Sequence, residues 1–449
     1  MKKPELLAPA GDFEKLQMAV AYGADAVYVG CKQFSLRANA KNFDLDELQQ
    51  AVAYAHSNNV KVYVSVNIFA HNRDFNGLED YLQALRDMGA DAVIVADMGV
   101  FDVARRINGL DIHISTQANV TNYQSALLYK KLGARRVILA RELSLGEIFE
   151  INGRLSTSSG AEAGTCPAAP PGAEAGKCPV ASPDVHELNK CPAAPPNSFE
   201  TEVFIHGAMC VSYSGRCLLS NYMAGRDANK GDCAQPCRWK YHLVEEQRPG
   251  EYIPVYENER GTHILNSKDL CMINHIPELV AAGVSSFKIE GRMKTAYYVA
   301  AVTRAYREAI DDFFTCESLY ASKKEYYMQE LEKTSHRDFF TGFYLGKPSE
   351  GQNLADTLHG NAQDFLGVVV DYDAAGRLAL VEQRNKFAIG DNIEFLKGRF
   401  TQSIAEMYDE GGAPISTAPH PTQLVQIKTL QPVEKFDILR RADEKNKAK

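Results

Sequence analysis

The first 150 residues alternate between short apolar runs and stretches with helical periodicity. A helical stretch at 44–59 opens on an aspartate that can cap its first turn, and another at 75–90 places three leucines on one face. Apolar, β-branched runs begin at Glu5, Asp25, Lys61, Asp91, Asp111 and Arg136. A succession of strand, helix, glycine and strand is typical of βα units on a parallel sheet.

Two later apolar runs, from Thr201 and from Ser285, bring the predicted strands to eight. Eight βα units favour an α/β fold of the (β/α)8, TIM-like barrel type over a doubly wound sheet. No predicted strand is followed by G-x-G-x-x-G, which disfavours a dinucleotide-binding fold. Chemistry in such barrels lies at the carboxyl ends of the strands, where some polar residues also cap helices. The polar residues at these ends are Asn67, Asp97, Thr116, Gln117, Arg141, Glu142, His206, Glu290 and Arg292.

The hydrophobic period changes after the last predicted helices of the barrel. Alternating runs in the C-terminal part, with a tight turn expected at 374–376, predict a small all-β, barrel-like domain. We therefore divide the chain into a catalytic barrel at 1–335, a β domain at 336–441 and a charged tail at 442–449.

A segment rich in Ala, Pro and Gly, 157–198, interrupts the predicted barrel between its sixth and seventh strands. It contains three Cys-Pro pairs, at Cys166, Cys178 and Cys191. This composition cannot build a core and predicts a disordered insertion. Two interpretations stay open: a redox- or haem-sensing loop, and a tolerated insertion in a surface loop.

Composition narrows the class of protein further. The chain has 449 residues and a net charge of −8, so it lacks the global basic field that would attract nucleic acid, and RNA binding would need a local patch. No apolar run is long enough to cross a membrane, and the first residues do not resemble a signal peptide. We expect a cytoplasmic protein with reduced cysteines, which there serve as metal ligands, catalytic groups or buried thiols.

Five cysteines fall in a region at 207–271, with gaps of six, fifteen, three and thirty-three residues between them. Structural zinc prefers two tight C-x2-C pairs, whereas an iron–sulfur cluster needs four cysteines and tolerates wide gaps. Buried, incidental thiols remain the alternative. Peptidase motifs such as H-E-x-x-H and G-x-S-x-G are missing, although a nucleophilic pair of Cys210 with His206 stays open.

The segment EVFIHGAMCVSYSGRCLLS resembles the signature of the collagenase-like peptidase family U-32. The resemblance extends through most of the chain outside 157–198, including RDANKGDCAQPC, GTHILNSKDLC, SFKIEGRMK and the β-rich C-terminal part. Members of this family resemble hydroxylation proteins, and the length, together with the C-terminal domain, points to the branch that makes 5-hydroxyuridine at the tRNA wobble position with prephenate as co-substrate. The resemblance implies a 4Fe–4S cluster on Cys210, Cys217, Cys233 and Cys271, with Cys237 as the rival fourth ligand.

Roles for the strand-end residues follow from this implied chemistry. Arginine suits the two carboxylates of prephenate, so Arg292, supported by Lys288 or Arg141, is expected to bind it. Glu290 and Glu142 are expected to orient these cations or to handle protons, and His206 is the expected proton-transfer residue. Lys288 has a structural alternative as the barrel partner of Glu142 or Glu290. Arg238 and Trp239 combine a cation with an aromatic ring that can stack on a base, although tryptophan also serves in packing.

Other functions stay open at this point. They are a collagenase-like peptidase, a hydroxylation protein for ribosomal RNA or a quinone precursor, and a non-catalytic RNA-binding accessory protein. The expected partners are tRNA, prephenate and an electron donor or second subunit, with no membrane association.

Overall fold

We describe a computed structural model of the chain, in which residues 2–32, 34–35, 41–157, 199–210, 217–226, 228, 232–238, 257–258, 261–262, 268–346 and 364–442 are described. All but the first residue of the insertion predicted at 157–198, and all but the first residue of the predicted tail, lie outside this set.

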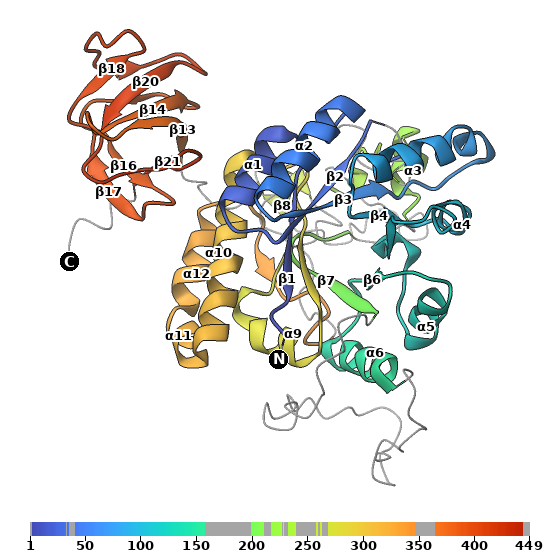
Figure 1. Cartoon of the computed structure of the whole chain (residues 1–449). Helices are drawn as coiled ribbons and strands as arrows, with labels where there is room; N and C mark the ends of the chain where they lie inside the picture. Colours follow the sequence, from blue (N-terminus) through green and yellow to red (C-terminus); the bar gives the residue numbers. More distant parts are fainter. Residues whose placement is uncertain are drawn as a thin grey trace, which may run out of the picture.

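Eight parallel strands form the closed barrel that the apolar runs predicted (Figure 1). Each strand pairs with the next around the barrel, and β11 pairs with both β1 and β7, which closes the sheet. The strands are β1 (Glu5–Pro9), β2 (Ala26–Gly30), β3 (Lys61–Val66), β4 (Ala92–Val95), β5 (Asp111–Ile114), β6 (Arg136–Ile138), β7 (Glu200–Ala208) and β11 (Ser286–Ile289). Nearly every residue in them is buried, as expected for a parallel sheet with covered faces.

Helices surround the barrel (Figure 1). Asp44 begins one of them with a capping box, because its carboxylate accepts from Glu47 N while the Glu47 carboxylate accepts from Asp44 N. The α-helices are α1 (Phe13–Ala21), α2 (Leu45–Ser57), α3 (Leu78–Asp87), α4 (Met98–Ala104), α5 (Tyr123–Lys131), α6 (Leu145–Thr157), α8 (Leu219–Ala224), α9 (Ile276–Ala281), α10 (Ala296–Thr315), α11 (Glu317–Ser322) and α12 (Lys324–Glu332). The shorter 3-10 helices are η1 (Asn72–Phe75), η2 (Thr116–Ala118), η4 (Pro236–Arg238) and η5 (Ile273–His275).

Two short strands extend the barrel sheet beyond β7. Strand β10 (Asp269–Cys271) pairs antiparallel with β7, and β12 (Phe339–Phe340) pairs in parallel with β10. Tyr344, a little further along, belongs to the barrel core and donates a hydrogen bond of 2.6 Å to the carbonyl of Phe204. Residues after the predicted boundary at 335/336 thus also pack on the barrel, through the β12 pairing and the Tyr344 hydrogen bond.

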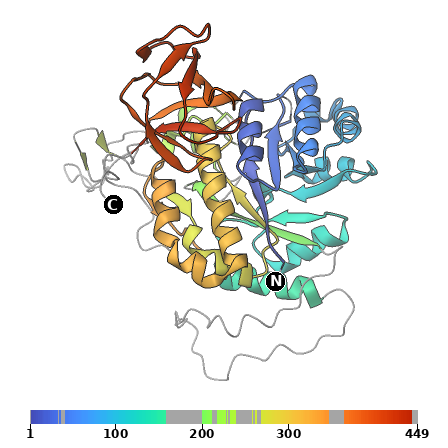
Figure 2. The ribbon, with the colours of Figure 1, turned by 60° about the vertical axis from the view of Figure 1, so that its left-hand side comes forward.

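The C-terminal domain begins after this segment and is an antiparallel sheet of seven strands (Figure 2). The predicted turn at 374–376 joins its first two strands. Its strands, in the order β17-β16-β21-β13-β14-β20-β18, are β13 (Phe365–Asp373), β14 (Leu378–Gln383), β16 (Asn392–Phe395), β17 (Phe400–Ser403), β18 (Met407–Asp409), β20 (Leu424–Lys428) and β21 (Ile438–Arg441). Two further two-stranded sheets, β15 (Phe387–Ala388) with β19 (Thr417–Ala418) and β8 (Glu257–Asn258) with β9 (Gly261–Thr262), pair separately.

The β domain packs against α1 and α10 of the barrel through a small apolar cluster of its own (Figure 2). Tyr22, directly after α1, joins Val368, Leu396 and Ile438 from the β domain in this cluster. The Tyr22 hydroxyl also accepts a hydrogen bond of 3.0 Å from the backbone N–H of Ile438. The two domains are thus joined by a packed and hydrogen-bonded interface.

Candidate functional site

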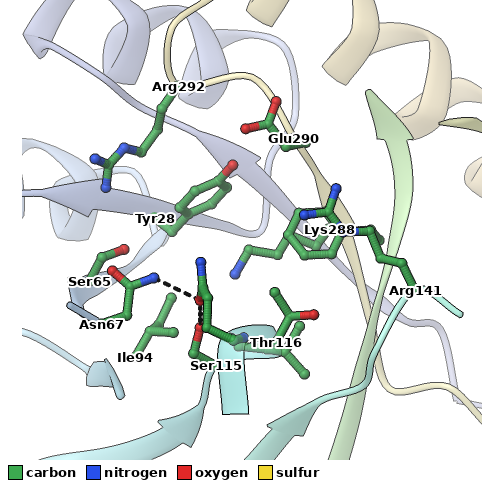
Figure 3. A pocket seen from close by; sticks show the side chains of 13 residues that line it. Tyr28, Ser65, Asn67, Ile94, Ser115, Thr116, Arg141, Lys288, Glu290 and Arg292 are labelled. Carbon is green, nitrogen blue, oxygen red and sulfur yellow. Dashed lines mark hydrogen bonds between the residues drawn. The ribbon is translucent and has the colours of Figure 1, made fainter. Parts of the chain in front are cut away.

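A pocket opens at the carboxyl ends of the barrel strands (Figure 3). Every side chain that lines it comes from a barrel strand or from the few residues just after one. The lining residues are Tyr28, Ser65, Asn67, Ile94, Ser115, Thr116, Gln117, Ile138, Arg141, Phe204, Lys288, Glu290 and Arg292. The pocket therefore lies where the fold predicts an active site, and it brings together four of the predicted site residues: Arg141, Lys288, Glu290 and Arg292.

Arg292 reaches the pocket from the turn after β11 and is only 4% exposed. Its Nη1 donates a hydrogen bond of 2.9 Å to Ser35 Oγ, and its Nη2 donates one of 3.3 Å to Asn42 Oδ1. The guanidinium passes so close to Gly30 that a Cβ there would lie 2.2 Å from Nη1. The glycine and the two polar side chains thus fix the orientation of the cation.

Arg141 enters the pocket from the turn after β6. Its Nη1 donates a hydrogen bond of 2.7 Å to the carbonyl of Ala208, and its guanidinium carbon lies 4.5 Å from the centre of the Phe204 ring. One edge of this guanidinium is held by the protein, and its face is shielded by an aromatic ring. Arginine in this setting is suited to binding a planar anion.

Lys288 lies on β11 with its ammonium inside the barrel. Nζ donates a hydrogen bond of 3.0 Å to Glu202 Oε1 and sits 4.4 Å from the centre of the Tyr28 ring. Burial lowers the pKa of Lys288, while the Glu202 carboxylate raises it. The predicted alternative of a partner in Glu142 or Glu290 is wrong, since the carboxylate at hydrogen-bond distance belongs to Glu202.

The opposite wall of the pocket is polar but uncharged. Asn67 Nδ2 donates a hydrogen bond of 3.0 Å to Gln117 Oε1, which also accepts from Ser115 Oγ. Thr116 Oγ1 donates to the carbonyl of Leu139 at 3.2 Å. Cations on one side and amides and hydroxyls on the other suit a small anionic molecule that also carries hydroxyl or carbonyl groups.

The two predicted acidic residues separate in the structure. Glu290 is half-buried and lines the pocket, whereas Glu142 is half-buried and is not one of the lining residues. Asp97, another polar strand-end residue, accepts hydrogen bonds from the backbone N–H groups of Gly99 and Val100 and so caps α4.

His206 also lies outside the pocket lining, although Phe204, two residues earlier on β7, is part of it. Strand alternation would place both side chains on the same face. The register between β11 and β7 shifts between Lys288 and Ile289, so that β7 has one extra residue and the next side chain is re-aimed. The His206 ring packs instead against Tyr298 and Tyr306 of α10.

Burial lowers the pKa of His206 to about 3. The ring is thus a neutral, enclosed group and has no direct access to the pocket. The bulge in β7 therefore keeps His206 out of the pocket lining, and the proton transfer expected of it stays a prediction.

The predicted iron–sulfur ligands occupy different environments. Cys271 is buried on β10, where it pairs with His206 across the strands, and burial raises the pKa of its thiol to about 11. Cys210 is exposed, and Cys217 and Cys233 are half-buried, as is the rival Cys237. Within the described residues no three Cys, His, Asp or Glu side chains are arranged to hold a metal ion. The 4Fe–4S cluster on these thiols therefore stays a prediction.

The predicted RNA-stacking pair is not tested. Trp239 and the side chain of Arg238 lie outside the described residues.

Sequence reasoning missed the partner of Lys288. Glu202 is fully buried, and a carboxylate rarely is unless it is paired. Its signal was present in the run TEVFIHG, because alternation on β7 puts Glu202 and Phe204 on the face that enters the barrel. Tyr28 and Ser65 were also missed, because they read as ordinary strand residues.

No helix among the described residues is both long enough and apolar enough to span a membrane.

Several known proteins are similar in sequence to this chain over almost its whole length. Relatives include "tRNA hydroxylation protein P1" of Bacillus subtilis, 37% identical over 98% of this chain and 95% of that protein. They also include "tRNA hydroxylation protein P" of Escherichia coli, 33% identical over 97% of this chain and 95% of that protein. A protein named "Collagenase" from Porphyromonas gingivalis is 29% identical over 98% of each chain.

Two family profiles cover most of the sequence. That of the C-terminal domain of peptidase family U32 matches 361–440, and that of peptidase family U32 itself matches 11–163 and 184–354. With relatives above 30% identity over almost the whole length, the chain belongs to peptidase family U32.

Proposed function

We propose that this chain is a tRNA hydroxylation enzyme that converts the wobble uridine to 5-hydroxyuridine with prephenate as co-substrate. The full-length relatives named as tRNA hydroxylation proteins support the RNA substrate. The observation that carries the proposal is the pocket at the barrel mouth, where Arg141, Lys288 and Arg292 converge.

The three cations match the chemistry of prephenate, a small molecule with two carboxylates. Arg292 is oriented before any ligand arrives, because Ser35 and Asn42 hold its guanidinium. An arginine of this kind binds a carboxylate without first losing side-chain freedom. Arg141 and Lys288 supply positive charge for the second carboxylate.

The remaining lining residues suit the uncharged parts of such a ligand. The amide of Gln117 and the hydroxyl of Thr116 lie across the pocket from the cations and can accept or donate hydrogen bonds. Glu290 lines the same pocket and is the carboxylate placed to accept a proton there. His206 has no part in this scheme, because its ring faces α10.

Hydroxylation of a ring carbon is redox chemistry, which ordinary side chains do not perform alone. An iron–sulfur cluster on Cys210, Cys217, Cys233 and Cys271 remains a prediction, and we route no step through it. Its test is the iron content and the absorption spectrum of protein purified without oxygen. Cys217→Ala should lose both, whereas Cys316→Ala, at an exposed thiol on another part of the chain, should keep them.

The peptidase alternative is less well supported by the site. The lining residues of the pocket include serine and threonine hydroxyls but neither a histidine nor a cysteine. A nucleophilic pair of Cys210 with His206 is disfavoured as well, because the first is exposed and the second is buried against α10.

The experiment that tests the proposal is nucleoside mass spectrometry of total tRNA from a strain that lacks the gene. We expect 5-hydroxyuridine and its derivatives to fall and to recover when the gene is returned. Unchanged tRNA in a strain without a second enzyme for the same modification contradicts the proposal. Ribosomal RNA and quinones from the same cultures then test the other hydroxylation reactions.

A further inference from the structure

Lys288 lines the pocket from inside the barrel, in surroundings that oppose a charged ammonium. Its side chain is 5% exposed, and its ammonium lies 4.4 and 5.5 Å from the centres of the Tyr28 and Phe204 rings. Two neighbouring arginines, Arg136 and Arg292, add repulsion. A lysine in this setting would lose its proton easily, and a neutral amine would no longer attract an anion.

Glu202 opposes that loss. Its Oε1 accepts the hydrogen bond from Lys288 Nζ at 3.0 Å, and its side chain is fully buried. Among the described residues this carboxylate is the one acceptor of the ammonium, which leaves two of its three N–H groups for a ligand. The pairing thus fixes the direction of the ammonium as well as its charge.

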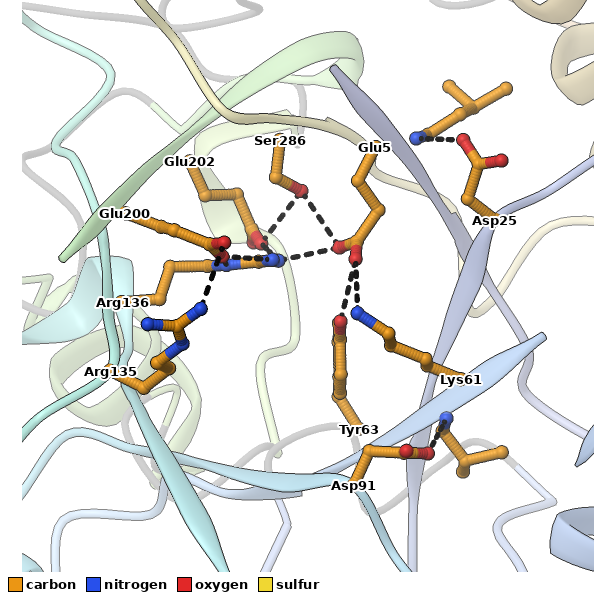
Figure 4. A network of polar contacts seen from close by, with 12 residues as sticks. Glu5, Asp25, Lys61, Tyr63, Asp91, Arg135, Arg136, Glu200, Glu202 and Ser286 are labelled. Atoms are coloured by element: carbon orange, nitrogen blue, oxygen red, sulfur yellow. Dashed lines mark hydrogen bonds and ion pairs between the residues drawn. The ribbon is translucent and has the colours of Figure 1, made fainter. Parts of the chain in front are cut away.

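Glu202 is in turn held by groups deeper in the barrel (Figure 4). Its Oε2 accepts from Arg136 Nη1 at 2.9 Å and from Ser286 Oγ at 3.1 Å. Arg136 bridges this carboxylate to Glu5 at 2.6 Å and to Glu200 at 2.6 Å. A buried charge is tolerated when it is paired and hydrogen-bonded in this way.

We propose that Glu202 is a positioning residue for the pocket: anchored by Arg136, it keeps the Lys288 ammonium charged and aimed at the ligand, so that Lys288 is a constant contact for one carboxylate of the substrate. The inference rests on the proposed function for the identity of that ligand. It assigns a role to a charge network that does not itself touch the ligand.

Several ionisable groups lie around Lys288, and their own protonation contributes to how its labelling changes with pH. From the strands and turns around it these are Glu202 and Arg136, Arg292, Arg141, Glu290 and His113. Burial holds the pKa of His113 well below its usual range, so it stays neutral when Lys288 titrates.

The first test needs no substrate. Acetic anhydride acetylates only neutral amines, so the rate of Lys288 labelling across pH, read by peptide mass spectrometry, reports the fraction of neutral Lys288. Glu202→Gln should lower the labelling midpoint by about two pH units, since it removes an opposite charge within hydrogen-bond distance. Glu200→Gln is the matched control, because Glu200 lies two residues away on β7 and also binds Arg136, but is not the partner of Lys288.

An unchanged midpoint in Glu202→Gln overturns the inference, and so does an equal shift in Glu200→Gln. If Glu202→Gln does not fold, Ser286→Ala provides the second variant. It removes one hydrogen bond to Glu202 Oε2 and should shift the midpoint in the same direction by a smaller amount. No shift in that variant, with wild-type folding, then counts against the proposal.

The second test measures prephenate affinity by calorimetry at pH 7 and at pH 9. Glu202→Gln should weaken binding by about tenfold or more, with the larger loss at the higher pH, because it removes one charged contact. Equal affinity in wild type and variant overturns the role in ligand binding. Failure of the wild-type protein to bind prephenate counts against the proposed function instead, and the labelling result still decides the coupling between Glu202 and Lys288.

Discussion

Replacing Arg440 by methionine should loosen the β domain from the barrel. Arg440 is fully buried on β21, and its Nη2 donates to both carboxylate oxygens of Glu330 on α12, at 2.9 Å each. Nε and Nη2 also donate to Glu394 at 3.0 and 2.8 Å. Methionine fills a similar volume but leaves two carboxylates without this cation.

The expected cost follows from the ion pair. Burial alone would raise the pKa of Glu330, but the Arg440 guanidinium, together with the smaller effect of the Lys333 ammonium, outweighs it and lowers that pKa from 4.5 to about 2. A shift of this size corresponds to about 3 kcal/mol of stability at pH 7. Breaking a buried pair from one side costs about 3–5 kcal/mol. The Glu330 contribution is present above pH 4.5 and is lost as the pH falls toward 2.

Native-state hydrogen exchange of the β13 and β21 amides measures this cost as a change in local opening free energy. Arg441→Met is the matched control on the same strand. Arg441 is 37% exposed and pairs with Asp364 and Asp391, so its loss should cost no more than about 1 kcal/mol. If the two variants open with free energies within about 1 kcal/mol of each other, the reasoning about the buried pair is refuted.

Two further predictions concern the buried carboxyl of Asp437 and the close approach of Arg292 to Gly30. Burial raises the pKa of Asp437 from 3.8 to about 6, so its stabilising effect is complete below about pH 4 and is lost as the pH rises through 6. Hydrogen exchange should show the wild-type β domain losing about 3 kcal/mol across this window relative to Asp437→Asn, and parallel curves would contradict the assignment. Gly30→Ala should abolish tRNA hydroxylation in cells, because its Cβ would lie 2.2 Å from Arg292 Nη1, whereas Gly146→Ala meets nothing within 4 Å and should be active. Equal activity of the two variants would show that the orientation of Arg292 is unimportant.

The sequence was sufficient to predict the barrel, because each of its strands is a short apolar run between helices. It was also sufficient to predict that Arg141, Lys288, Glu290 and Arg292 lie together, since the carboxyl ends of parallel strands converge at one end of the barrel. Their positions at predicted strand ends, with the rule that active sites of this fold lie there, were enough for that prediction.

What the sequence did not reveal depends on pairings between distant segments. His206 turns away from the pocket because of a bulge, which appears only in the register of β11 against β7. Strand β12 consists of two residues whose partner is 70 positions earlier, for example Phe339 with Asp269, so the period change near it was taken for a domain boundary. Lys288 was expected to pair near the pocket mouth, but its partner Glu202 lies one strand over and deeper in the barrel.

The most direct test of the central claim is the 5-hydroxyuridine content of tRNA in a strain that lacks the gene and carries either wild-type protein or Arg292→Lys at equal abundance. Lysine keeps the charge but loses the two-pronged contact that Ser35 and Asn42 orient. We predict a loss of about tenfold or more, since a hydrogen bond to a charged group contributes about 1.5–3 kcal/mol. Wild-type levels of 5-hydroxyuridine in the Arg292→Lys strain would contradict the assignment of this pocket to the reaction.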